Sequence, residues 1–199
     1  MGNNCSDGSS QGQQKNGKKG LNLKKPVHEC KVVILGERAV GKTSVAYRYL
    51  EDKFSDSHIV TLGVNFVQPE VKLDNGTTVK INLWDTAGEE RFRSMLPMYY
   101  KSSKAAIFTY DIGNAISFQN IDDWVSELND HVAADDIILY LVGNKKDLPP
   151  EQRKVSTEEG QKTAERLGMR FMEVSAKTGD GVPELFKTVA EEFVKKFKP

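Results

Sequence analysis

Residues 36–43 have the spacing G-x-x-x-x-G-K-[ST], which is the pattern of a phosphate-binding loop. The residues are, in order, Gly36, Glu37, Arg38, Ala39, Val40, Gly41, Lys42 and Thr43. Such glycines let backbone N–H groups close around phosphates, the lysine places a positive charge at the β- and γ-phosphate oxygens, and the threonine hydroxyl is a ligand for Mg²⁺. The pattern follows a predicted strand and opens a predicted helix, so its context favours a nucleotide site over a glycine-rich turn that matches by chance.

The segment Trp84-Asp85-Thr86-Ala87-Gly88 ends the second strand of a predicted hairpin. A carboxylate at a strand end beside a phosphate-binding loop can hold Mg²⁺ through water, and a glycine three residues later can bring its N–H to a γ-phosphate. An aspartate that leaves a strand is, by itself, more often a turn residue. Together with the phosphate-binding loop, Asp85 and Gly88 favour a site for Mg²⁺ and a triphosphate.

Two later loops, each following a predicted strand, have residues suited to guanine: Asn144, Lys145 and Asp147 in the first, and Ser175, Ala176 and Lys177 in the second. Guanine presents an N1–H and an exocyclic amine, two donors that the Asp147 carboxylate can accept together. A backbone N–H of the second loop is suited to the guanine O6. Each loop alone is of common composition, but the four segments in this order form a specific pattern.

Short apolar or alternating segments predict the strands that position these loops: Cys30–Leu35, Val71–Leu73, Val79–Trp84, Ala105–Tyr110, Ile137–Val142 and Arg170–Val174. The second and third flank Asn75-Gly76, a strong signal for an antiparallel hairpin. The runs at Ala105–Tyr110 and Ile137–Val142 are continuously apolar, as in strands buried on both faces.

Helical patterns separate these strands. One helix follows the phosphate-binding loop to about Leu50, and another has an apolar face formed by Ile121, Trp124, Val125 and Leu128. Ser156 or Thr157 is expected to cap a helix that ends near Gly168, and Pro183 is expected in the first turn of the last helix. The alternation predicts an α/β fold with a mostly parallel sheet and helices on both faces.

The composition agrees with one such domain. The chain has 199 residues, 38% hydrophobic and 28% charged, which suffices for a single core. No apolar run reaches the ~18–20 residues needed to span a bilayer, and we expect neither a transmembrane segment nor a secretory signal. Cys5 and Cys30 cannot by themselves form a disulfide framework or a zinc site, which indicates a reducing cytosol.

The net charge of zero conceals an asymmetry between a basic N-terminal segment and an acidic remainder. Residues 1–25 contain five lysines and one aspartate, whereas the rest has 23 basic and 27 acidic residues. The segment has few apolar residues, so we expect a disordered basic arm over 1–25 and a folded domain over 26–199. A basic arm suits an anionic membrane or nucleic acid; the domain lacks a basic stripe, which disfavours nucleic acid.

From these motifs the chain resembles the Ras superfamily of small GTPases over residues 29–197. Several segments look like the Rab branch, and the last of them like its early-endosome group: Leu62-Gly63-Val64-Asn65-Phe66, Trp84-Asp85-Thr86-Ala87-Gly88, Glu90-Arg91-Phe92 and Pro97-Met98-Tyr99-Tyr100. The resemblance implies a P-loop GTPase fold whose sheet is mostly parallel and six-stranded, with one antiparallel hairpin strand. It also implies a monomer that binds GTP or GDP with Mg²⁺.

The resemblance assigns further roles. Thr61 would join Thr43 and Asp85 at Mg²⁺, and Phe54 would lie near the guanine. Residues 54–66 and 86–100 would be switches that GTP orders and that effectors, exchange factors and activating proteins contact. The effector surface would comprise Leu62, Phe66, Trp84 and Tyr99. The alternative for these aromatic residues is ordinary core packing.

Departures from the Rab pattern bear on hydrolysis and anchoring. The catalytic set would be Glu89, Lys42, Thr61 and Gly88, but Rabs usually have Gln in place of Glu89 and a small residue in place of Arg38. We therefore expect a switch that hydrolyses GTP slowly; the alternative is a GTP-loaded recruitment module that hardly hydrolyses. Another P-loop enzyme, such as a small-molecule kinase, is disfavoured by the guanine motif.

The chain ends Lys195-Lys196-Phe197-Lys198-Pro199, without the cysteines that Rabs usually prenylate. Residues 1–6 instead match the myristoylation pattern M-G-x-x-x-[ST] on Gly2. One myristoyl chain binds membranes only marginally, so Cys5, as a palmitoylation site, and the lysines would add to it. The alternative is an accidental match. A few N-terminally acylated endosomal Rabs share this feature, so we expect the cytoplasmic face of endosomal membranes, with a plasma-membrane pool.

Overall fold

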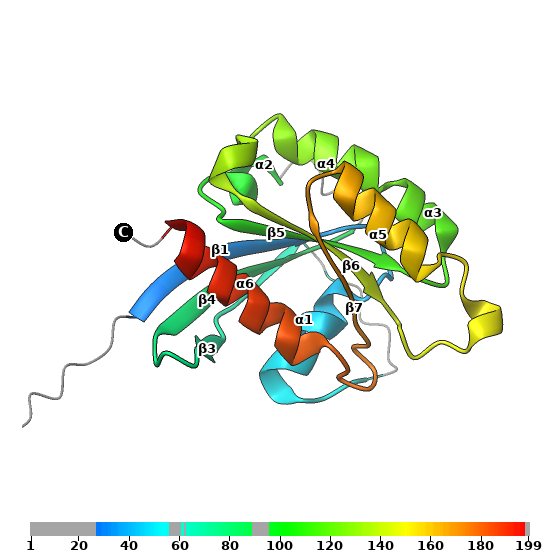
Figure 1. Cartoon of the computed structure of the whole chain (residues 1–199), viewed down its shortest axis with the longest axis horizontal. Coiled ribbons are helices and arrows are strands. Elements are labelled where there is room, and N and C mark those ends of the chain that lie inside the picture. The colour runs from blue at the N-terminus through cyan, green and yellow to red at the C-terminus, as the bar shows by residue number, and fades with distance from the viewer. Residues whose placement is uncertain (1–26, 56–60, 62, 89–95, 198–199) are drawn as a thin grey trace, which may run out of the picture.

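In the computed structural model, the described residues are 27–55, 61, 63–88 and 96–197. Their central element is a mixed sheet of seven strands (Figure 1): β1 (Val27–Leu35), β2 (Val64–Val67), β3 (Glu70–Lys72), β4 (Thr78–Thr86), β5 (Ala105–Asp111), β6 (Ile138–Asn144) and β7 (Arg170–Glu173). The strand order is β2-β4-β1-β5-β6-β7, and β3 also pairs with β4. The ladder from β4 through β1, β5 and β6 to β7 is parallel, whereas β2 and β3 are antiparallel to β4. This confirms the predicted α/β fold.

The hairpin between β3 and β4 is confirmed, with Val71 opposite Val79. Gly76 has φ 77°, a left-handed conformation that favours glycine, and the Asn75 side chain accepts a hydrogen bond from Thr77 N. The strand count differs from the predicted six because two short strands, β2 and β3, share β4 as a partner. Pro69 lies between them and has no N–H to donate, which interrupts the ladder there.

Helices cover both faces of the sheet (Figure 1), as predicted. One face carries α1 (Lys42–Glu51) and α6 (Val182–Phe197); the other carries α2 (Pro97–Tyr100), α3 (Ala115–Gln119), α4 (Ile121–Asn129) and α5 (Thr157–Arg166). Two 3₁₀ turns flank β6 along the chain: Ala134–Asp136 lies between α4 and β6, and Pro150–Gln152 lies between β6 and α5. The sheet therefore separates two apolar cores, one lined by α1 and α6 and the other by α2, α4 and α5.

Local signals account for the helix ends. Of the two residues expected to cap the fifth helix, Ser156 is the N-cap, in a reciprocal capping box with Glu159. That helix ends at Arg166, two residues before Gly168, whose φ of 67° is left-handed. Pro183 lies in the first turn of α6, as predicted. None of the helices in the described ranges is long and apolar enough to cross a bilayer.

Candidate functional site

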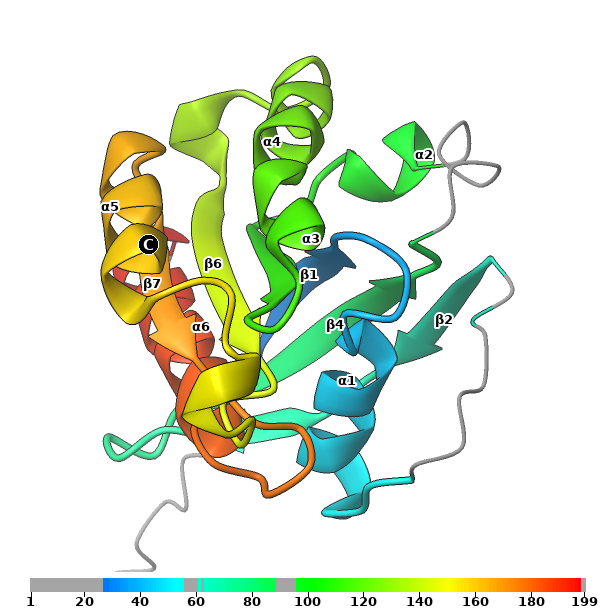
Figure 2. The same cartoon turned by 90° about the vertical axis from the view of Figure 1, so that its right-hand side faces the viewer.

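The predicted chemical segments meet at one edge of the sheet. Figure 2 views the molecule from the side toward which the parallel strands point, where the loops after β1, β4, β5, β6 and β7 come together. Carboxyl ends of parallel strands share an edge, and ligands of open α/β sheets bind in the crevice outside them. Of the predicted site residues, Gly2, Cys5, Leu62 and Glu89 lie outside the described residues.

The phosphate-binding loop joins β1 to α1 and depends on two glycines. Gly36 has φ 131° and Gly41 has φ 95°, both in the left-handed range. A Cβ on Gly36 would overlap the Thr109 carbonyl oxygen, and one on Gly41 would overlap the Asn144 side chain. The loop is therefore packed against β5 and β6 too closely for any side chain at these positions.

Lys42 is the first residue of α1, and its side chain is only 5% exposed. Its Nζ donates to two carbonyl oxygens of the loop, Gly36 O at 2.7 Å and Glu37 O at 2.9 Å. Burial lowers the pKa of Lys42 to about 8, while the charges of Asp85 and Glu37 oppose that shift. The ammonium group is thus held inside the loop, where an anion would stabilise its charge.

Three side-chain oxygens gather beside this lysine. The Thr43 hydroxyl donates to Asp85 Oδ2 at 2.6 Å and lies 2.7 Å from the Thr61 hydroxyl. The other carboxylate oxygen, Asp85 Oδ1, is buried and has no hydrogen-bond partner within the described part of the chain. Burial raises the pKa of Asp85 to about 6, opposed by the Thr43 hydrogen bond and the Lys42 charge.

This oxygen cluster fits Mg²⁺, a hard cation that proteins bind through oxygen ligands, with one or two carboxylates among them, together with substrate phosphates. The orphaned Asp85 Oδ1 is the observation that supports the fit, because a buried carboxylate oxygen without a donor needs a cation or water. Thr43, Thr61 and Asp85 are the residues that would hold the ion. When bound, Mg²⁺ would neutralise charge on the phosphate oxygens.

Gly88 follows β4 and lies against the phosphate-binding loop. A Cβ at this position would lie 2.5 Å from the Glu37 carbonyl carbon and would also overlap Lys42 Nζ. Only glycine therefore allows the chain to pass so close to the Glu37 backbone. The structure thus brings Gly88 to the phosphate-binding loop.

Asn144 connects two of the predicted loops. Its side-chain amide donates to Val40 O at 2.8 Å, and its Oδ1 accepts a hydrogen bond from Ala176 N at 3.1 Å. Asn144 is 2% exposed, so these buried bonds fix the phosphate-binding loop relative to residues 175–177. The sequence predicts that a backbone N–H of residues 175–177 contacts guanine O6; in this structure the Ala176 N–H is directed at Asn144 Oδ1.

Asp147 is exposed, and its Oδ1 accepts a hydrogen bond from the Ser175 hydroxyl at 2.5 Å. The Ser175 hydroxyl also accepts one from Thr178 N at 3.0 Å, so Ser175 holds both the carboxylate and its own loop. Lys145, at φ 68°, directs its ammonium to Asp111 Oδ2 at 2.6 Å. The two loops predicted to bind guanine, residues 144–147 and 175–177, therefore lie side by side; we call them the base-site loops.

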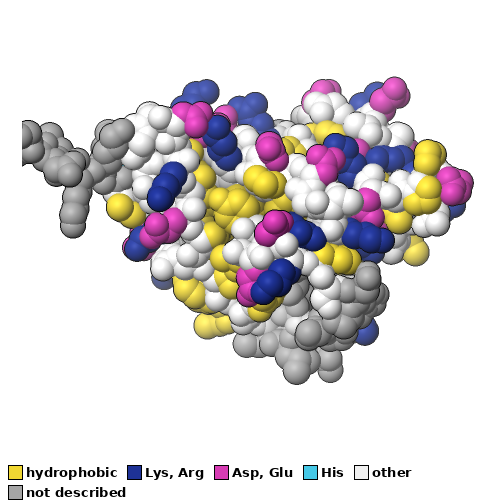
Figure 3. Space-filling model, turned by 90° about the horizontal axis from the view of Figure 1, so that it is seen from below, with side chains coloured by type: hydrophobic (Ala, Val, Ile, Leu, Met, Phe, Trp, Pro, Cys, Tyr) yellow, Lys and Arg dark blue, Asp and Glu magenta, His cyan; other side chains and the backbone are white. Residues whose placement is uncertain are grey.

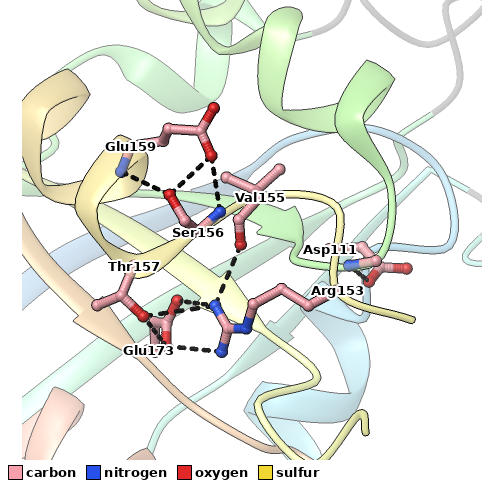
Figure 4. Close-up of polar contacts among 8 residues, drawn as sticks. Asp111, Arg153, Val155, Ser156, Thr157, Glu159 and Glu173 are labelled. Carbon is pink, nitrogen blue, oxygen red and sulfur yellow. Dashed lines mark hydrogen bonds and ion pairs between the residues drawn. The ribbon is translucent and has the colours of Figure 1, made fainter. Parts of the chain in front are cut away.

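A bidentate ion pair outside the motifs braces these loops (Figure 4). Arg153 Nη1 and Nη2 donate to Glu173 Oε1 and Oε2 at 2.6 and 3.0 Å, and Thr157 also donates to this carboxylate. Glu173 is two residues before Ser175, and Arg153 is six residues after Asp147. Our sequence reasoning missed this pair. The only signal was an acidic residue in a strand, which needs a partner when buried.

Three residues of the predicted effector surface form an aromatic cluster centred on Trp84. The rings of Phe66 and Trp84 are 4.8 Å apart between centroids, and those of Trp84 and Tyr99 are 5.0 Å apart. Phe66 is 46% exposed, whereas Trp84 and Tyr99 are half-buried and pack against the core beneath α2 and α4. Phe54 is also exposed.

On the α1 and α6 side, basic and acidic side chains are intermingled around apolar ones (Figure 3).

A family model described as the Ras family matches residues 31–195, most of the chain. The chain therefore belongs to the Ras family of small GTPases. It is a GTP-binding switch, and GTP hydrolysis is the general activity of this family. Ras-family proteins generally bind GTP and GDP with Mg²⁺ and contact effectors, exchange factors and activating proteins through their switch regions.

Proposed function

We propose that this protein is a Rab-type switch that exchanges GDP for GTP and recruits effectors to endosomal membranes. The observation that carries the proposal is the position of two consecutive residues, Trp84 and Asp85, in β4. Successive side chains of a strand point to opposite faces. Trp84 therefore joins the exposed aromatic cluster while Asp85 joins Thr43 and Lys42, so one strand connects the nucleotide site with the proposed effector surface.

Within this proposal, the base-site loops provide guanine selectivity. Asp147 would accept hydrogen bonds from the guanine N1–H and exocyclic amine, and Lys145 would flank the base. Residues 36–43, with Gly88, would bind the phosphates, and Thr43, Thr61 and Asp85 would hold Mg²⁺. The hydrogen bonds of Asn144 and Ser175 support this assignment because they hold the separate loops together.

Nucleotide competition with Asp147→Asn tests the base site. The amide loses one acceptor and gains a donor suited to the C2 carbonyl of xanthine. We expect weaker GTP binding and a preference shifted toward xanthosine triphosphate, measured by displacement of a fluorescent GDP. Exposed Asp123→Asn, on α4, is the matched control and should keep the wild-type preference. An unchanged preference in Asp147→Asn would remove this carboxylate from the base site.

Slow hydrolysis is part of the same proposal, and a GTP-loaded recruitment module is the second candidate. Arg38 is exposed on the phosphate-binding loop, next to Ala39 at φ 62°. This exposed arginine supports both the slowly hydrolysing switch and the GTP-loaded recruitment module. A large cation there would occupy space that an activating protein needs for its arginine finger.

Membrane attachment would come from residues 1–25, through acylation of Gly2 and Cys5 and through the five lysines.

A further inference from the structure

Arg48, in the last turn of α1, contacts the backbone of a loop that lies 128 residues later in the sequence. Its Nε donates to Ala176 O at 2.8 Å, and its Nη2 donates to Lys177 O at 2.7 Å. The Arg48 side chain is only 13% exposed. A planar guanidinium fixes the relative directions of its donors, so these bonds set the orientation of the loop as well as its distance from α1.

The guanidinium is itself held at the end of α1. Arg48 Nη1 donates to Asp52 O at 2.8 Å and to Asp52 Oδ1 at 3.0 Å. Asp52 caps the helix with φ 51°, and its N–H donates to Arg48 O at 3.0 Å. The arginine is thus anchored to α1 on one side and to the base-site loop on the other. Its charge faces the Asp52 carboxylate and three backbone carbonyls.

Ala176 is consequently held at both of its backbone polar groups. Its N–H donates to Asn144 Oδ1 at 3.1 Å, and its carbonyl accepts from Arg48. The two bonds restrict the rotation of this residue about its backbone. A recognition N–H must be aimed at its acceptor to a small tolerance, because hydrogen bonds weaken steeply away from linearity.

We propose that Arg48 is a positioning residue for guanine recognition: by holding Ala176 O and Lys177 O, it orients the backbone of residues 175–177, from which an N–H would reach the guanine O6. This inference rests on the proposed base site and goes beyond it, because Arg48 lies outside the four nucleotide motifs. A merely structural role would affect all nucleotides equally. A positioning role affects most strongly the nucleotides that depend on O6.

Two nucleotides separate these roles. 6-Thioguanosine diphosphate keeps the N1–H and the amine that face Asp147 but replaces O6 with sulfur, a weak hydrogen-bond acceptor. We would measure its affinity and that of GDP for the wild type, Arg48→Lys and Arg48→Met. Lysine keeps the positive charge but lacks the several fixed N–H donors of the guanidinium. Methionine keeps a long apolar side chain and has no donor. Arg166→Gln, which removes an exposed arginine that pairs with Asp122, is the control.

We expect the wild type and Arg166→Gln to prefer GDP. Both Arg48 variants should lose affinity for GDP more than for the thio analogue, lowering the preference by about two- to tenfold, the range of one net hydrogen bond. Equal losses for both nucleotides would overturn the positioning role while leaving the base site in place. A wild type without preference would overturn the O6 assignment and the role of Arg48 with it. Should Arg48→Met not fold, Arg48→Lys still decides between these outcomes.

Discussion

The indole N–H of Trp124 donates a hydrogen bond to Glu37 Oε1 at 3.2 Å, joining α4 to the phosphate-binding loop. Trp124 is fully buried in the core beneath α4. One turn further along the same helix, Glu127 accepts a hydrogen bond from the Tyr100 hydroxyl of α2 at 3.1 Å. The helix therefore contacts both the phosphate-binding loop and Tyr100, the last residue of the second predicted switch.

Trp124→Phe should destabilise the protein and release nucleotide faster. Phenylalanine fills most of the space but has no N–H, so a partly buried hydrogen bond is lost at a cost of about 1–3 kcal/mol in unfolding free energy. Thermal unfolding and GDP dissociation would measure the two effects. Asp123→Asn, at an exposed position of the same helix, is the control and should remain close to the wild type. Equal dissociation rates in Trp124→Phe and the wild type would show that this bond does not hold the loop.

Asp85→Asn should stabilise the nucleotide-free protein at pH 7 while weakening its binding of nucleotide with Mg²⁺. Burial raises the pKa of Asp85 from 3.8 to about 6. Between pH 3.8 and about 6, the folded state therefore binds more protons than the unfolded state. Protonation of Asp85 then stabilises the folded protein, and this stabilisation is lost as the pH rises through about 6. The neutral amide avoids this loss, which corresponds to about 1–3 kcal/mol.

The measurement is thermal unfolding of protein stripped of nucleotide with a chelator, between pH 4 and 8, repeated with Mg²⁺ and GDP. The wild type should lose stability from pH 4 to 7 relative to the variant. With Mg²⁺ and GDP the order should reverse, because the variant lacks the carboxylate for the ion. A variant that is less stable in both conditions would contradict the proposed role of Asp85.

Glu89→Gln should accelerate single-turnover GTP hydrolysis. Glutamine can orient water and donate an N–H to the charge that develops on the γ-phosphoryl group, whereas glutamate lacks that donor and adds negative charge. Arg38→Gly in the same chain should restore the response to an activating protein, since arginine fingers contribute roughly 10³–10⁵-fold in rate. If the wild type hydrolyses GTP faster than Glu89→Gln, then Glu89 positions the water effectively and the slow-switch proposal is wrong.

Gly2→Ala should abolish membrane association because no acyl chain can be attached to alanine at this position. Cys5→Ser should bind weakly and reversibly, since one acyl chain and the lysines remain. Both variants would be expressed in eukaryotic cells, and the fraction of each that sediments with the membranes would be measured. Retention of Gly2→Ala on membranes at the wild-type level would contradict lipid anchoring through Gly2.

Short-range patterns in the sequence were sufficient to predict most of the elements and motifs. The spacing of Gly36, Gly41 and Lys42, the turn at Asn75-Gly76 and the apolar face around Trp124 are each contained in a few consecutive residues. Their physical causes are local: backbone conformation, side-chain periodicity and the donors that a loop can present. The α/β fold and the position of each motif after a strand could therefore be deduced without coordinates.

Only the tertiary structure decided which side chains hold those motifs in place. Arg48 donates a hydrogen bond to Ala176, 128 residues away in the sequence. Arg153 donates to Glu173, 20 residues away, and Trp124 donates to Glu37, 87 residues away. No periodicity or spacing links such partners, because their proximity depends on how strands and helices pack. Ala176, which belongs to a loop that the guanine motif predicts, is held in place by hydrogen bonds with the distant side chains of Asn144 and Arg48.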